Sequence, residues 1–158
     1  MIARIVVTAA VLATALASPG SAQDRENAPL AVVVRSDASI DSLSLGELRR
    51  IFMGDRQFAG DRNRITLFIP SPGAEGRGTA MRVIYRMREV EYRQYWVAKI
   101  FRAEVVSGPR VASAEEAKRL VVATRGALAL IPAAAVDQTV KVVVVGGRRP
   151  GQAGYALQ

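Results

Sequence analysis

The chain has 158 residues, a formal net charge of +8 at pH 7, and neither cysteine nor histidine. The lack of cysteine excludes a disulfide-stapled fold, so one ordinary domain of this length must rely on its hydrophobic core. The lack of both residues excludes the common zinc and blue-copper sites as well as Ser-His-Asp and Cys-His catalysis, and we expect no cofactor.

The basic excess is mostly arginine, and it is dispersed along the chain. The pair Arg148-Arg149 is the one tight basic pair outside a predicted helix. Proteins that bind single-stranded nucleic acid interleave basic and aromatic side chains, and no such cluster is present. We therefore expect an anionic ligand or partner, and no nucleic acid.

The first 22 residues have the order of charge, apolar core and small residues that is typical of a secretory signal peptide. Arg4 supplies the charge, residues 5–17 are apolar, and residues 18–22 are small or helix-breaking. The alternative is a membrane anchor, but the apolar core is only about half of the roughly 20 residues that span a bilayer. We predict cleavage after Ala22, a periplasmic protein without a membrane span after cleavage, and a flexible N-terminus over residues 23–29.

The rest of the chain alternates between apolar runs that predict strands and segments with helical spacing. In chain order we predict a strand at 30–34, a helix at 44–54, a strand at 65–69, helices at 77–87 and 91–102, a helix from Ser113 to Gly126, and strands at 127–131 and 140–145. The strands are apolar on both faces, which is typical of a sheet covered by helices on both sides. We expect one α/β domain over residues 30–147 and a loose tail over residues 148–158.

Local signals place the helix ends and the core. Ser44 and Glu47 have the spacing of a capping box, and Gly54 is the expected stop. The aromatic residues Phe52, Trp96 and Phe101 are predicted to be core. In the helix from Ser113 to Gly126, Ala114, Ala117, Leu120 and Val121 are predicted to face inward and Glu115, Glu116, Lys118 and Arg119 outward.

A loop of small residues at 70–79 follows a predicted strand and opens a predicted helix. Ligands of open α/β sheets bind at the carboxyl ends of strands, and a helix N-terminus offers free N–H groups to an anion. The candidate ligand-binding residues are Ser71, Glu75, Arg77, Gly78, Thr79 and Arg82. Ser36, Asp37 and Ser39 follow the first strand and are expected to face the same cleft.

Each candidate residue has a possible role in ligand binding and an alternative role that is only structural. Thr79 offers a hydroxyl and an N–H group to an oxyanion, and Gly78 lets the anion approach the backbone. Alternatively, Thr79 caps its own helix. The two arginines can contact phosphate in a bidentate manner or lie on a solvated face. Glu75 can accept a proton from a protonated ligand or stabilise the positive helix end, and Ser71 can donate a hydroxyl or shape a turn.

Several of these pieces together resemble one protein family. They are Leu45-x-x-Leu48-x-x-Ile51-Phe52-x-Gly54, Gly78-Thr79, Trp96 with Phe101, Ser113-x-Glu115-Glu116, Gly126-Ala127 and Val140-Lys141-Val142. In this order they resemble the phosphate-type periplasmic substrate-binding proteins of ABC transporters, which have the type 2 periplasmic binding fold. The resemblance implies a three-layer α/β lobe with a mixed sheet, a small oxyanion such as phosphate as ligand, and an ABC transporter membrane component or another envelope protein as partner.

The chain departs from that family in three ways. The family has two lobes, whereas this chain resembles one lobe with its two hinge-crossing segments, near residues 32–34 and 142–144. The family's anion loop reads Arg-x-Asp-x-Ser-Gly-Thr, and here the first three fixed positions hold Gly73, Glu75 and Arg77. Ala129-Leu130 also stands where the family usually carries Gly-Tyr.

Two hypotheses follow. The first is an exported, non-enzymatic, solute-binding-like protein that binds a small oxyanion weakly and is linked to ABC-type phosphate transport. The alternative is a periplasmic interaction or accessory module that kept the fold and lost the ligand site. An enzyme is not expected, because the candidate acids and bases, among them Asp61, Glu89 and Tyr92, are not paired at a diagnostic spacing.

Overall fold

The computed structural model describes residues 21–59 and 62–158. The predicted signal peptide lies outside this part, apart from its last two residues. No helix in the described residues is both long enough and apolar enough to span a bilayer.

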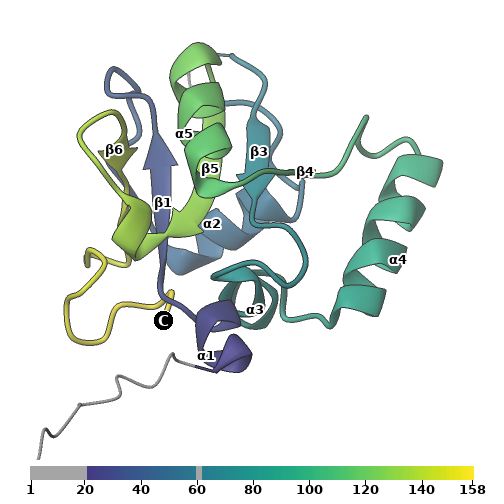
Figure 1. Cartoon of the computed structure of the whole chain (residues 1–158). Helices are drawn as coiled ribbons and strands as arrows, with labels where there is room; N and C mark the ends of the chain where they lie inside the picture. The colour runs from purple at the N-terminus through teal and green to yellow at the C-terminus, as the bar shows by residue number, and fades with distance from the viewer. Residues whose placement is uncertain (1–20, 60–61) are drawn as a thin grey trace, which may run out of the picture.

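A five-stranded mixed sheet forms the centre of the domain (Figure 1), in the order β4-β3-β5-β1-β6. The strands are β1 (Leu30–Val34), β3 (Thr66–Ile69), β4 (Arg110–Val111), β5 (Ala127–Pro132) and β6 (Lys141–Val142). β3 runs parallel to β4 and β5, whereas β1 runs antiparallel to β5 and β6. Every residue of β1 and β5 is buried, as the apolar runs predict for the centre of a covered sheet.

Helices cover both faces of the sheet and complete three layers. The helix α5 (Ala114–Ala123) lies in front of the sheet in Figure 1, and α2 (Leu45–Phe52) lies behind it. On the α2 side, the core also contains side chains of a π-helix, η1 (Ala80–Tyr85), and of α4 (Glu89–Phe101). The sheet thus separates two apolar clusters, and the predicted three-layer α/β fold is confirmed.

The smaller elements connect these layers. They are α1 (Ala22–Glu26), β2 (Ser42–Leu43), α3 (Arg77–Thr79), a short 3₁₀-helix, η2 (Ala133–Ala135), and β7 (Val144–Val145), which pairs in parallel with β2. The predicted strand at 140–145 is therefore two short strands, because β6 and β7 pair with different partners. β2 and β4 were not predicted, since two residues carry no periodic signal.

The predicted helix starts are confirmed where a capping box or serine cap is present. The Ser44 hydroxyl accepts from the Glu47 N–H at 3.1 Å, and the Glu47 carboxylate accepts from the Ser44 N–H at 2.8 Å. Gly54 follows α2 with a φ of 76°, as a helix stop requires. The Ser113 hydroxyl likewise accepts from the Glu116 N–H at 3.2 Å.

Three predictions about helical segments are wrong. The segment 77–87 is a short α-helix followed by the π-helix η1, rather than one α-helix. Lys118 is buried, because its ammonium group reaches Asp137 at 2.5 Å and Glu115 at 2.7 Å. Phe101 is 89% exposed. It lies five residues after the buried Trp96, which is about 140° around an α-helix and therefore on another face.

The termini are more ordered than the sequence predicts. The segment 23–29 is not a flexible lead, because it contains most of α1, which Ser21 and Asp24 cap with a capping box. The tail 148–158 is not loose either. Tyr155 and Leu157 are buried in the core cluster, and the Leu157 carbonyl accepts from the Leu30 N–H at 2.8 Å.

Tyr155→Phe should leave the free energy of unfolding unchanged or raise it by up to about 1 kcal/mol. The hydroxyl of Tyr155 is buried and has no hydrogen-bond partner among the residues that the structure describes, and burial raises the pKa of this phenol. Its removal therefore relieves a desolvation cost without breaking a bond. Urea unfolding followed by circular dichroism measures the difference, and a clear loss of stability would show that the hydroxyl has a partner.

Candidate functional site

The loop 70–79 leaves the carboxyl end of β3 and enters α3 through two tight turns. The Ala74 N–H donates to the Ser71 carbonyl at 3.0 Å, and the Arg77 N–H donates to the Ala74 carbonyl at 3.1 Å. Gly73 and Gly76 have φ values of 76° and 79°, a region that favours glycine. Ser71 is thus part of a turn, as its ordinary alternative predicts, and Glu75 is exposed.

The helix α1 lies directly on this loop, beside α3 in Figure 1. The Gly76 N–H donates to the Arg25 carbonyl at 2.9 Å. A Cβ atom on Gly78 would lie 2.8 Å from Asn27 Oδ1 and 3.1 Å from the Glu26 carbonyl oxygen. The close approach that Gly78 permits is therefore made by the backbone and side chains of α1.

The guanidinium of Arg77 is buried and fully used inside the protein. Its Nε and Nη2 atoms donate to the two carboxylate oxygens of Glu89 at 2.6 and 3.0 Å, and Nη1 donates to the Pro70 carbonyl at 2.8 Å. It also lies 4.9 Å from the ring centroid of Tyr92. Hydrogen bonding to Arg77 lowers the pKa of Glu89. Arg77 is therefore neither on a solvated face nor free to bind an anion, and no pattern in the sequence indicates its pairing with Glu89.

Among the candidates, Thr79 has a fully buried hydroxyl that finds no hydrogen-bond partner in the described part of the chain. It does not cap its own helix, because α3 begins after Gly76 and no side-chain cap bond forms at Thr79. A buried hydroxyl without a hydrogen bond lowers the stability of the folded state by about 1–3 kcal/mol. Stability therefore does not explain why Thr79 is present.

The other candidates are only partly brought together. Arg77, Gly78 and Arg82 line one open depression of about 650 Å³ between α1, η1 and the start of α4, whereas Ser71, Glu75 and Thr79 do not. Arg82 donates to Asn27 Oδ1 and to the Gln158 carbonyl, both at 3.0 Å. Arg86 also lines the depression and is exposed, and its guanidinium makes no hydrogen bond or ion pair within residues 21–59 and 62–158.

The expectation that residues 36–39 face the same cleft is wrong. β1 runs antiparallel to β5, and β5 runs parallel to β3. The residues after β1 and the loop after β3 therefore lie at opposite ends of the strands. There Arg35 and Asp37 pair at 2.8 Å beside a separate pocket.

Comparison with solved structures identifies the fold. The chain is similar to a protein described as a phosphate ABC transporter substrate-binding protein, with bound phosphate, from Clostridium perfringens, at a TM-score of 0.61 and 16% identity over 77% of this chain and 46% of that one. It is also similar to an ABC-type phosphate transport receptor from Vibrio cholerae, at a TM-score of 0.64 and 17% identity over 82% of this chain and 53% of that one. A third similar structure is PstS from Borrelia burgdorferi, at a TM-score of 0.58 and 13% identity over 78% of this chain and 49% of that one.

The chain has the fold of phosphate ABC transporter substrate-binding proteins. It spans about half the length of each of these three neighbours. The identities of 13–17% establish the fold alone. No protein-family model matches the sequence, and no curated protein matches it significantly.

Proposed function

We propose that the protein is a periplasmic solute-binding protein, linked to ABC-type phosphate transport, that binds a small oxyanion such as phosphate at the loop 70–79 when α1 moves away. The observation that carries the proposal is the buried, unpaired hydroxyl of Thr79 beside Gly78. An oxyanion would give this hydroxyl the partner it lacks. The fold supports the choice of ligand, because one of its neighbours is described with bound phosphate.

The helix α1 must move because it holds the groups that an anion would use. The N–H of Gly76 is bonded to Arg25, and the surface of Gly78 is covered by Glu26 and Asn27. Displacement would free both, and it would also release Arg82 from Asn27. The positive charge would then come from Arg82 and Arg86, since Arg77 stays with Glu89.

The displacement of α1 should require little free energy. The helix has only five residues, and none of them is buried. Its capping box depends on Ser21, whose hydroxyl accepts from the Asp24 N–H at 3.3 Å and whose N–H donates to the Asp24 carboxylate at 2.9 Å. Cleavage after Ala22, which we propose, would remove this cap and weaken the helix by about 1 kcal/mol. The site remains open to water, so we expect weak binding.

The test compares three chains by isothermal titration with phosphate. They begin at Ser21, at Gln23 and at Asn27, and they carry the capped helix, the uncapped helix and no helix. We expect phosphate affinity to rise in that order, at best to the millimolar range for the monomer. The absence of heat in all three chains would overturn the proposal, and a micromolar constant would contradict the open site.

Thr79→Val should separate the ligand role of the hydroxyl from its structural role. Valine keeps the shape and removes the oxygen, so stability without phosphate should stay equal or rise by about 1 kcal/mol. In the chain that begins at Asn27, the same change should abolish the heat of phosphate binding. Thermal unfolding with and without phosphate measures both effects, and an undiminished response to phosphate would place the anion elsewhere.

The second candidate is an interaction or accessory module of the periplasm that has lost the ligand site. It is favoured by the pairing of Arg77 with Glu89, which leaves Arg77 unable to bind a ligand. It is also favoured by large apolar side chains on the outer face of α4, where Phe101 is 89%, Val97 68% and Val90 52% exposed. This candidate predicts binding to envelope membranes that is insensitive to phosphate and is lost in Phe101→Ser. Membrane binding that phosphate alters would instead support the first candidate.

A further inference from the structure

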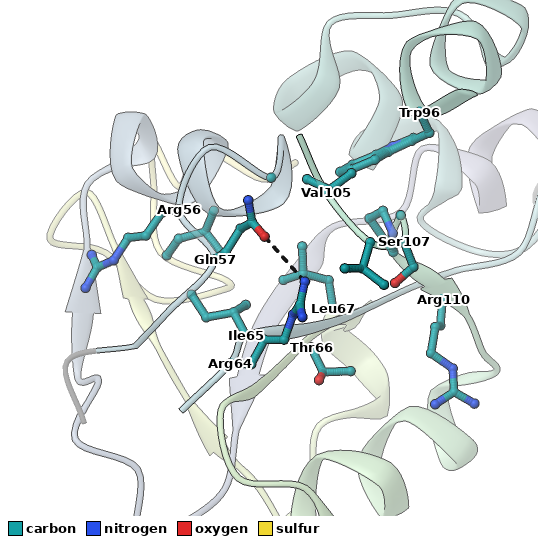
Figure 2. Close-up of a pocket in the computed structure, with 15 residues that line it drawn as sticks. Arg56, Gln57, Arg64, Ile65, Thr66, Leu67, Trp96, Val105, Ser107 and Arg110 are labelled. Carbon is teal, nitrogen blue, oxygen red and sulfur yellow. Dashed lines mark hydrogen bonds between the residues drawn. The ribbon is translucent and has the colours of Figure 1, made fainter. Parts of the chain in front are cut away.

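We propose that a second pocket, away from the loop 70–79, binds a small organic anion that carries an apolar body. The pocket lies at the amino end of β3 and beside the segment before β4, with the end of α2 and the middle of α4 as further walls (Figure 2). Its volume is about 300 Å³, at the lower end of the range for small-molecule sites. The inference does not rest on the proposed function, because the two sites share no residue.

The pocket is positively charged. Its lining includes Arg56, Arg64 and Arg110, and no acidic residue among residues 21–59 and 62–158 lines it. None of the three arginines forms an ion pair within the part of the chain that the structure describes. An anion would therefore meet uncompensated guanidinium groups, which is the arrangement that favours carboxylate or phosphate.

Arg64 is the central cation. Figure 2 shows its guanidinium in the middle of the pocket beside Gln57, with Nη2 3.5 Å from Gln57 Oε1. Gln57 is itself fixed, because its Nε2 donates to the Glu104 carbonyl at 2.8 Å. All three arginines are exposed, but Arg56 and Arg110 lie on the two flanks with their guanidinium groups directed outward. They would have to turn inward to reach an anion, so Arg64 should contribute most.

The opposite wall of the pocket is apolar and held in place. Trp96 is buried against two glycines: a Cβ on Gly54 would lie 3.1 Å from its ring, and a Cβ on Gly108 would lie 3.0 Å from it. Val105 and Leu67 extend this apolar surface. A wall of this kind favours a ligand with an apolar ring or branched chain, because inorganic phosphate would leave the wall in contact with water.

Two hydroxyl groups are available to orient the ligand. Thr66 and Ser107 line the pocket, and neither hydroxyl makes a hydrogen bond within the described residues. Together with Arg64, they can hold the polar end of a ligand while its apolar body contacts Trp96. A compact aryl phosphate or aryl carboxylate has this combination of groups.

The experiment uses the intrinsic fluorescence of the purified protein, because Trp96 is the only tryptophan and lines the pocket. We would titrate phenyl phosphate, inorganic phosphate and benzyl alcohol at constant ionic strength. We expect a saturable change with phenyl phosphate and affinities at least about tenfold weaker for the other two, a difference of about 1.4 kcal/mol. No saturable change with phenyl phosphate, or equal affinity for inorganic phosphate, would overturn the proposal.

Variants with the same change of charge separate the site from a general effect of net charge. Arg64→Gln should weaken phenyl phosphate binding by about tenfold or more, and Arg110→Gln by less. Arg119→Gln, on α5 at the other face of the sheet, should leave it unchanged. Equal weakening by Arg64→Gln and Arg119→Gln would overturn the site. Thr79→Val should not affect this titration, so failure here is distinguishable from failure of the phosphate proposal.

Discussion

Gly76→Ala should lower the free energy of unfolding by about 3 kcal/mol and loosen the loop 70–79. The φ of Gly76 is 79°, and a Cβ there would overlap Leu30 Cδ2. Leu30 is fully buried in β1, an interior strand of the sheet, so it has little room to move aside. The left-handed conformation costs about 1 kcal/mol or more for a residue with a Cβ, and forced overpacking adds about 1–3 kcal/mol.

Gly73→Ala is the matched control for this prediction. Gly73 has a φ of 76°, and the atom nearest to an added Cβ would be Glu26 Oε1 at 4.0 Å. It therefore has the conformational cost of about 1 kcal/mol without the steric clash. Urea unfolding of the two variants beside the parent protein isolates the clash by difference. Equal losses of unfolding free energy in the two variants would show that the Leu30 side chain moves aside. The close contact between Gly76 and Leu30 would then not be what holds the loop.

Glu89→Gln should lower the free energy of unfolding by about 2 kcal/mol at pH 7. The guanidinium of Arg77 is 3% exposed and would lose its counter-charge while it remains buried. Removal of one partner from a fully buried pair costs about 3–5 kcal/mol. The loss here should be smaller, because the Glu89 side chain is 35% exposed and water can replace part of the interaction.

The same variant should change the dependence of stability on pH. Hydrogen bonding to Arg77 lowers the pKa of Glu89 below its ordinary value of 4.5. This stabilisation is therefore present above that ordinary value and is lost as the pH falls through the lowered pKa of the folded state. The unfolding curves of parent and variant should converge in acid. A difference that stays constant in acid would mean that charge on Glu89 is not its origin.

Glu91→Gln is the control for charge alone. Glu91 pairs with Arg88 at 2.9 Å, but the two side chains are 45% and 84% exposed. An exposed pair of this kind contributes about 0–1 kcal/mol. If Glu91→Gln lowered the free energy of unfolding as much as Glu89→Gln, burial of Arg77 would not explain the effect of Glu89→Gln.

Much of the fold could be predicted because its signals are local. The apolar run of residues 30–34 predicts β1 with its observed bounds, and the serine caps at Ser44 and Ser113 place the starts of α2 and α5. The π-helical form of η1 could not be predicted, since a π-helix is rare and carries no distinct pattern of side chains. The burial of Tyr155 and Leu157 depends on tertiary packing that residues in a glycine-rich tail do not reveal.

The candidate site was harder to predict because its state depends on distant contacts. Arg77 and Glu89 lie on different elements, so neither spacing nor composition indicates their pair. The position of α1 over the loop is likewise a tertiary contact. One local signal for α1 was present, however: Ser21 and Asp24 have the spacing of a capping box and would have argued against a flexible terminus.

The position of β1 between β5 and β6 has a consequence for the time at which the chain can fold. Val33 pairs with Ala129 and with Val142, which is 142 − 33 = 109 residues further along the chain. Pairings this distant in sequence form slowly, and a chain made from its N-terminus meets these partners last. For the exported protein that we propose, the strand nearest the signal peptide stays without its neighbours until almost the whole chain is available. The order of its strands thus delays folding during the period in which the precursor must remain unfolded for export.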